Sequence, residues 1–171
     1  MRLDKGVRVF LAVVLGGVMY FALTAPAGAD PPTHEPFVNV GGTLPAGIGC
    51  AGFPITVTID VDRQQVTTFF DNGTPTRQTI TGRLILSVAN DSTGESRTYR
   101  LGGAIHIAFG ADGSLTLTLT GNTLVSLFPN DVPPGPSTTK GSGRAVIHID
   151  ALFTLVSRTG HVEDVCAELA P

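Results

Sequence analysis

Apolar and polar residues alternate strictly over residues 53–62 and less regularly in several later segments. Over 53–62, apolar Phe53, Ile55, Val57, Ile59 and Val61 alternate with proline, threonine and aspartate. A period of two with β-branched residues on the apolar side predicts a half-buried β-strand. Similar patterns follow over 66–70, 76–90, 97–109, 114–122, 123–128, 144–158 and 161–166. The chain from residue 53 is therefore predicted to form about eight strands.

Short turn sequences separate most of these patterns. Asn72-Gly73 is a strong hairpin signal, and 90–94 and 111–113 are rich in turn residues. Short connections predict antiparallel neighbours. Glycines at 82, 102 and 103 interrupt strand patterns, where a bulge or a barrel bend is expected. The predicted fold is all-β: an antiparallel barrel of about eight strands closed by one disulfide, with a two-sheet β-sandwich as the alternative.

One segment, 129–143, contains many Pro, Gly, Ser and Thr residues and is predicted to be a long irregular loop. Two interpretations of this loop remain open. It is either a flap over a barrel mouth or a plain surface loop.

The N-terminal 29 residues have the pattern of a secretory signal peptide. Three basic residues precede an unbroken apolar run over 9–23, and Ala27-Gly28-Ala29 fits a cleavage site. The alternative is an uncleaved anchor that retains the protein at the membrane, because no charge occurs over 9–29. Three parts are predicted: the signal peptide (1–29), a Pro/Gly-rich N-terminal arm (30–49) and a single β domain (50–171).

Two cysteines, Cys50 and Cys166, flank the predicted β domain. In an exported chain two cysteines favour a disulfide, which would connect the first long strand to the last. The alternative, a pair of free redox thiols, lacks the C-x-x-C motif. Secretion into an oxidising compartment is thus the predicted localisation.

Charge limits the possible partners. Residues 30–171 contain eight basic and thirteen acidic residues, which gives a net charge of −5. Nucleic acids and anionic membranes require a basic footprint, so neither is expected as a partner. The expected partner is an unknown small molecule or a component of the cell envelope. No cofactor and no metal site are predicted.

Several turn motifs resemble a group of uncharacterised secreted proteins of actinobacteria. These motifs are 49–55 (Gly-Cys-Ala-Gly-Phe-Pro-Ile), 90–94, 111–114 and 164–166. The resemblance implies secretion and a disulfide-closed β fold, and it implies no activity and no site. The strand layout also looks like the eight-stranded barrels of the dirigent and allene oxide cyclase kind, a likeness of architecture alone.

The candidate catalytic residues are His106, His148 and Asp150. His106 lies opposite the apolar face of its strand, among small residues, and His148 shares a predicted face with Asp150. Together they could form an acid–base or metal cluster. The alternative is two histidines on a solvated face, which the absence of any ligand spacing favours.

Phe69 and Phe70 are the candidate ligand-binding residues. Adjacent strand residues face opposite ways, so at least one ring must leave the main core. Asp60 and Asp62 are predicted to share one solvated strand face, which offers no cleft for paired carboxylates.

Three functions remain open from the sequence. The first is a secreted, non-enzymatic binding module for a small apolar ligand or an envelope component. The second is a cofactor-free barrel isomerase or cyclase with a histidine base. The third is a structural envelope protein.

Overall fold

The computed structural model describes residues 30–171, so the predicted signal peptide lies outside the described residues. The elements are β1 (Thr33–Phe37), β2 (Gly42–Leu44), β3 (Ile55–Asp71), β4 (Thr74–Asn90), β5 (Ser96–Phe109), β6 (Leu115–Leu127), β7 (Ser137–Ile149), β8 (Phe153–Asp164) and α1 (Val165–Glu168). No helix in this part of the chain is long and apolar enough to cross a membrane.

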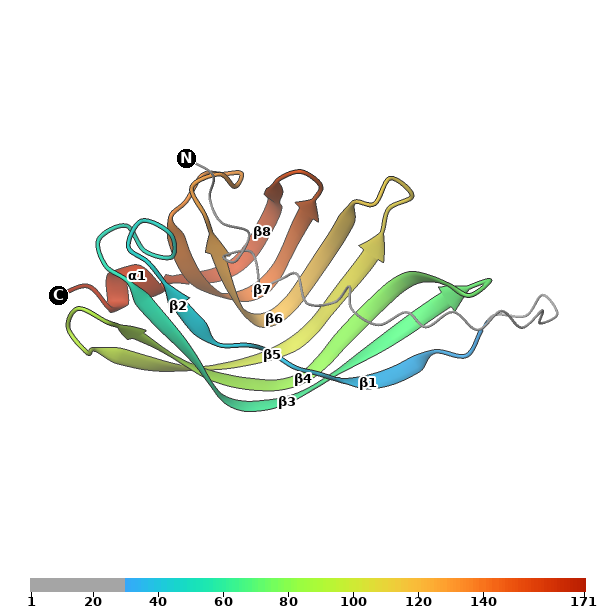
Figure 1. The fold of residues 1–171 in the computed structure, drawn as a ribbon, viewed down its shortest axis with the longest axis horizontal. Helices are drawn as coiled ribbons and strands as arrows, with labels where there is room; N and C mark the ends of the chain where they lie inside the picture. Colours follow the sequence, from blue (N-terminus) through green and yellow to red (C-terminus); the bar gives the residue numbers. More distant parts are fainter. Residues whose placement is uncertain (1–29) are drawn as a thin grey trace.

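All eight described strands belong to one antiparallel sheet with the order β1-β3-β4-β5-β6-β7-β8. The short strands β1 and β2 pair with different parts of β3 along the same edge. The sheet is strongly curved and forms an open trough (Figure 1). Consecutive strands are neighbours because tight turns join them, as the turn sequences predicted.

The prediction of an antiparallel all-β fold is confirmed, but closure into a barrel is not. Strand β8 and the β1/β2 edge do not pair with each other, so the sheet has two free ends. The two-sheet sandwich is not found either, since the described strands form one sheet.

The inner face of the trough carries the buried side chains. On β4 these are Ile80, Leu84, Leu86 and Val88, at alternate positions. They belong to two clusters. One packs α1 and the 44–55 segment over β4 and β5, and the other joins the inner faces of β4–β7. The buried side chains of β4 thus follow the period of two seen in the sequence.

A row of paired glycines crosses the sheet at the boundary between these clusters. Register pairs join Gly82 to Gly103, Gly103 to Gly121, Gly121 to Gly143 and Gly143 to Gly160. All five have positive φ values. A Cβ on Gly103 would overlap the carbonyl oxygen of Thr120 on the next strand. Glycine thus allows adjacent strands to approach closely where the trough bends.

The disulfide between Cys50 and Cys166 is confirmed, with a Cα–Cα distance of 5.6 Å. It joins the segment before β3 to α1, which follows β8. The buried Thr138 hydroxyl donates to the Gly49 carbonyl at 2.9 Å, and Asn90 donates to the Leu169 carbonyl at 2.9 Å. The first and last parts of the domain are therefore connected by sulfur and side chains rather than by a strand ladder.

Several local predictions were wrong. The patterns at 53–62 and 66–70 form one strand, β3, and those at 114–122 and 123–128 form one strand, β6. The pattern at 144–158, expected to be one strand, is divided between β7 and β8.

The irregular segment over 129–143 is shorter than expected, because β7 already begins at Ser137. Val132 forms a bridge to the edge of β8: its carbonyl oxygen accepts from the Leu155 N–H at 2.7 Å, and its N–H donates to the Phe153 carbonyl at 2.9 Å. This segment therefore covers a sheet edge rather than a barrel mouth.

Gly82 is not a bulge, since its register with both neighbouring strands is continuous. The short helix α1 was missed although Asp164 caps it.

Candidate functional site

The outer face of the sheet is a regular array of polar side chains. Thr79 of β4, His106 of β5 and Thr118 of β6 stand side by side in register. The next row toward the hairpin tips contains Arg77, Ala108 and Thr116.

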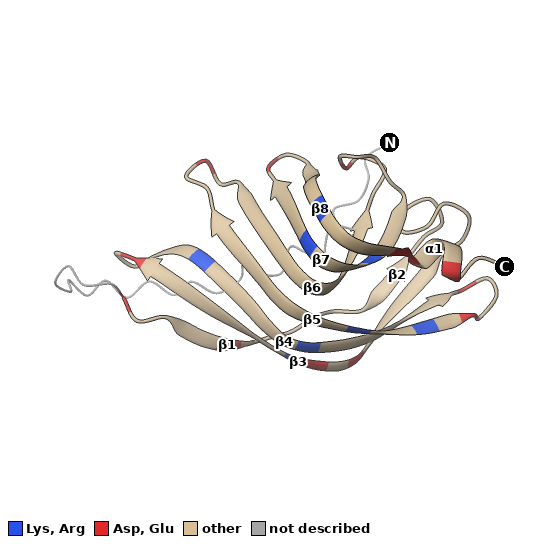
Figure 2. Cartoon of the chain, turned by 180° about the vertical axis from the view of Figure 1, so that it is seen from behind, with Lys and Arg blue, Asp and Glu red and all other residues tan. Residues whose placement is uncertain are grey.

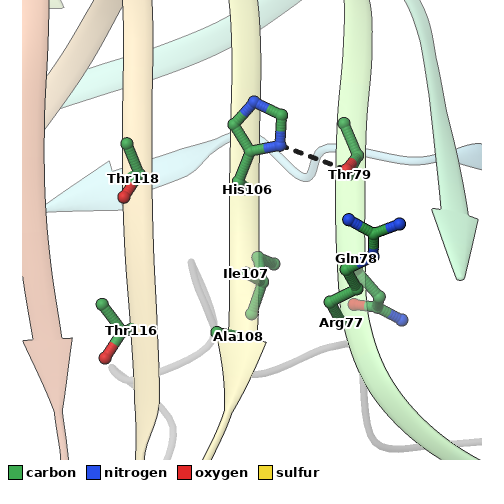
Figure 3. A pocket seen from close by; sticks show the side chains of 8 residues that line it. All are labelled: Arg77, Gln78, Thr79, His106, Ile107, Ala108, Thr116 and Thr118. Atoms are coloured by element: carbon green, nitrogen blue, oxygen red, sulfur yellow. Dashed lines mark hydrogen bonds between the residues drawn. The ribbon is translucent and has the colours of Figure 1, made fainter. Parts of the chain in front are cut away.

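Ala108 creates a hollow in this face because its side chain is shorter than those around it. The hollow has a volume of about 260 Å³ and is lined by Arg77, Gln78, Thr79, His106, Ile107, Ala108, Thr116 and Thr118. Figure 3 shows Thr79 and the two threonines of β6 on opposite sides of the His106 strand. It is an open depression with hydroxyl, imidazole and guanidinium groups at its rim.

Hydrogen bonds position the histidines of this face. His106 Nδ1 lies 3.2 Å from Thr79 Oγ1, the bond drawn in Figure 3. His148 Nδ1 lies 3.3 Å from Thr116 Oγ1 in the same type of cross-strand pair. His106 therefore has one nitrogen engaged with a hydroxyl and can offer the other to a ligand, whereas the second nitrogen of His148, Nε2, faces Asp150.

Arg77 supplies the cationic group of the hollow. Its guanidinium carbon lies 3.9 Å from the ring centroid of Phe69, a cation–π contact across β3 and β4. No carboxylate of the described residues lies within ion-pair distance of Arg77. The Phe69 ring thus holds Arg77 in place without neutralising it.

The structure does not bring His106 and His148 together. Both lie on the outer face, but strand β6 separates them, and two strand spacings amount to about 10 Å. Asp150 Oδ2 lies 3.9 Å from His148 Nε2 in the turn after β7. Across residues 30–171 no group of three or more His, Cys, Asp or Glu side chains could hold a metal ion.

Phe69 and Phe70 are both half-buried. Phe69 lies under Arg77 on the outer face, so it supports the hollow through that arginine rather than lining it.

The prediction that Asp60 and Asp62 share a face was wrong. The β3–β4 register passes from Ile59 to Val61 and leaves Asp60 in a bulge. Asp60 accepts from the Ser87 hydroxyl at 2.6 Å on the outer face, whereas Asp62 lies opposite the inner residue Leu84. There Asp62 accepts from the backbone N–H of Asn39 at 2.8 Å.

Sequence reasoning missed Arg77, Thr79, Thr116 and Thr118 as site residues. The available signal was their period-two pattern: each threonine alternates with a buried leucine or isoleucine on its strand. Without the register between strands, nothing indicated that these side chains surround Ala108.

Comparisons of the chain with protein-family models, curated proteins and solved structures find no match. The resemblance to secreted actinobacterial proteins stays a prediction.

Proposed function

We propose that this protein is a non-enzymatic binding module that acts outside the cell and takes a polar ligand at the hollow around Ala108. The observation that carries the proposal is the composition of the hollow. Three threonine hydroxyls, one imidazole and one arginine without an acidic partner surround an alanine floor. Hydroxyl-bearing ligands such as saccharides can both donate to and accept from such groups.

The proposed polar ligand differs from the small apolar ligand that was one expectation from the sequence. The inner face is occupied by two clusters of buried, mostly aliphatic side chains, which argues against a small apolar ligand in a lumen. An envelope component that contacts the outer face can use the hydroxyl, imidazole and guanidinium groups around the hollow. The predicted signal peptide and the disulfide support export.

Catalysis by a histidine base has less support. A general base needs to reach the reacting proton, with partners that orient it. His106 has Thr79 as its hydrogen-bond partner, and His148 lies two strands away with Asp150 in a turn. A structural envelope role is the alternative that remains if the hollow binds nothing.

Filling the hollow tests the proposal. We expect Ala108→Phe to abolish binding to a panel of neutral and anionic oligosaccharides, measured by glycan array and isothermal titration calorimetry. Ala89→Phe is the matched control, because Ala89 lies on the same face of β4 as Thr79 but far from the hollow. Equal binding by both variants, or no binding by the unmodified protein, would overturn the proposal.

A further inference from the structure

The paired positions of the outer face around the hollow contain no acidic residue. The nearest carboxylates lie at the margins, where Asp150 is 3.9 Å from His148 and Asp60 lies further along β3. Four rows of directly paired residues cross β3–β7 on this face, and we call these twenty positions the outer grid. The rows are Phe69-Arg77-Ala108-Thr116-His148, Thr67-Thr79-His106-Thr118-Val146, Gln65-Thr81-Ala104-Thr120-Arg144 and Arg63-Arg83-Gly102-Asn122-Ser142.

The charge of the outer grid is opposite to that of the chain. Residues 30–171 contain more acidic than basic residues, yet the outer grid has four arginines and no aspartate or glutamate. Figure 2 shows basic segments within the strands, and acidic segments at several turns, on β3, at the end of β8 and in α1. Among the described residues, none of these four arginines has a carboxylate within 4 Å.

Two of these arginines lie close enough to repel each other. Arg63 and Arg83 are direct cross-strand partners, and like charges opposite each other destabilise a sheet. An anion bound between them would remove this repulsion. The pair is thus unfavourable in the free protein and favourable in a complex with an anion.

The spacing of the arginines indicates an extended ligand. Arg77 and Arg83 are six residues apart on β4, about 20 Å along the strand. Arg144 lies three strands from Arg83, about 14 Å across the sheet. These distances are too long for one small anion to contact all of the arginines, whereas a polymer with repeated negative groups is long enough to reach several of them.

We infer that the outer grid binds a linear anionic polysaccharide, an inference that rests on the proposed function of the hollow. Arginine forks pair with carboxylate, sulfate or phosphate groups, and the six threonines of the grid offer hydrogen bonds to sugar hydroxyls. Single-stranded nucleic acid fits less well, because its bases require exposed aromatic rings and Phe69 is covered by Arg77. A membrane fits less well, since Val146 is the one aliphatic residue of the grid larger than alanine.

Binding to defined polymers tests this inference. The probes are polygalacturonate, neutral dextran, oligo(dT) and phosphatidylglycerol vesicles, each titrated calorimetrically into the purified disulfide-bonded protein. We expect polygalacturonate to bind and to lose about tenfold or more in affinity between 20 and 200 mM salt, because its contacts release counterions. Dextran is expected not to bind measurably, and oligo(dT) and the vesicles are expected to bind more weakly than polygalacturonate.

Arginine-to-glutamine variants inside and outside the outer grid test whether its positive charge is needed for binding. Arg83→Gln combined with Arg144→Gln should weaken polygalacturonate binding at least tenfold and flatten its salt dependence. Arg97→Gln is the control, because Arg97 pairs with Glu95 outside the grid. An equal loss in Arg97→Gln, or tighter binding of oligo(dT) or vesicles, would overturn the inference. Binding of a neutral oligosaccharide that depends on Ala108, without polygalacturonate binding, would overturn it and leave the proposed function intact.

Discussion

Gly103 shows how a single missing side chain permits the curvature of the sheet. Its φ of +145° lies in a region that other residues rarely adopt, and the Thr120 carbonyl occupies the place of a Cβ. Its neighbour Gly102 has no such requirement, since a Cβ there would lie 3.7 Å from its nearest neighbour, the Gly82 carbonyl oxygen. Two adjacent glycines of the same strand therefore have different roles.

We expect Gly103→Ala to lower the free energy of unfolding by about 2–4 kcal/mol, because strain in φ adds to a backbone clash. Gly102→Ala should change it by less than about 1 kcal/mol. Urea unfolding of both variants measures the difference. Similar losses in the two variants would show that close approach at Gly103 does not limit stability.

At the scale of elements, alternation predicts that most of the chain forms strands, and it indicates the buried side where only one face of a strand is apolar. On β6, Leu117 and Leu119 are buried, as their spacing indicates. The alternation does not reveal where a strand shifts by one residue. The bulge at Asp60 moves Asp62 to the inner face, and its cause is the three-dimensional pairing with β4 rather than a local sequence signal.

The candidate site was harder to predict for the same reason. His106 was correctly expected on a polar face, but its neighbours depend on the register of β4, β5 and β6. A shift of one residue in either pairing would place a buried residue beside it instead of threonine: Gln78 or Ile80 from β4, or a leucine from β6. The hollow at Ala108 and the outer grid are thus properties of register, which the sequence of one strand does not contain.

Strands β7 and β8 are connected by an ion pair that makes their association sensitive to pH. Lys140 Nζ donates to both Glu163 carboxylate oxygens, at 3.0 and 2.8 Å, between directly paired residues. The hydrogen bond from Lys140 lowers the pKa of Glu163, and His161 at 3.7 Å also favours the charged carboxylate. A carboxyl group whose pKa is lowered by folding stabilises the protein above its unfolded pKa, and this contribution is lost as the pH falls through the folded pKa.

We therefore expect Glu163→Gln to lower the melting temperature at pH 7. Below about pH 4, where a carboxyl group protonates, the difference in melting temperature between the variant and the unmodified protein should shrink. Thermal unfolding from pH 7 to pH 3 measures this. Glu95→Gln is the control, because its pair with Arg97 is about half exposed and should contribute less. A difference that stays constant over this range would show that the Lys140 pair is not its source.

For the whole molecule, the disulfide replaces the closure that a barrel would obtain from strand pairing. In the sheet order β8 and the β1/β2 edge do not pair with each other, while Cys50 and Cys166 connect segments 116 residues apart. The cysteine count and the predicted export indicated this bond from the sequence. Barrel closure was not predictable in the same way, since it depends on strand tilt and on how far the glycine row bends the sheet.

We expect the double variant Cys50→Ala/Cys166→Ala to lose about 4–5 kcal/mol of unfolding free energy, because closing a loop of this length restricts the unfolded chain. The buried hydrogen bonds of Thr138 to Gly49 and of Asn90 to Leu169 do not require sulfur, so the variant should keep the native circular dichroism spectrum. Urea unfolding, beside the reduced unmodified protein as control, measures the loss. Unchanged stability in the variant, or free thiols in the native protein, would show that these hydrogen bonds and the core hold the two ends of the trough without the disulfide.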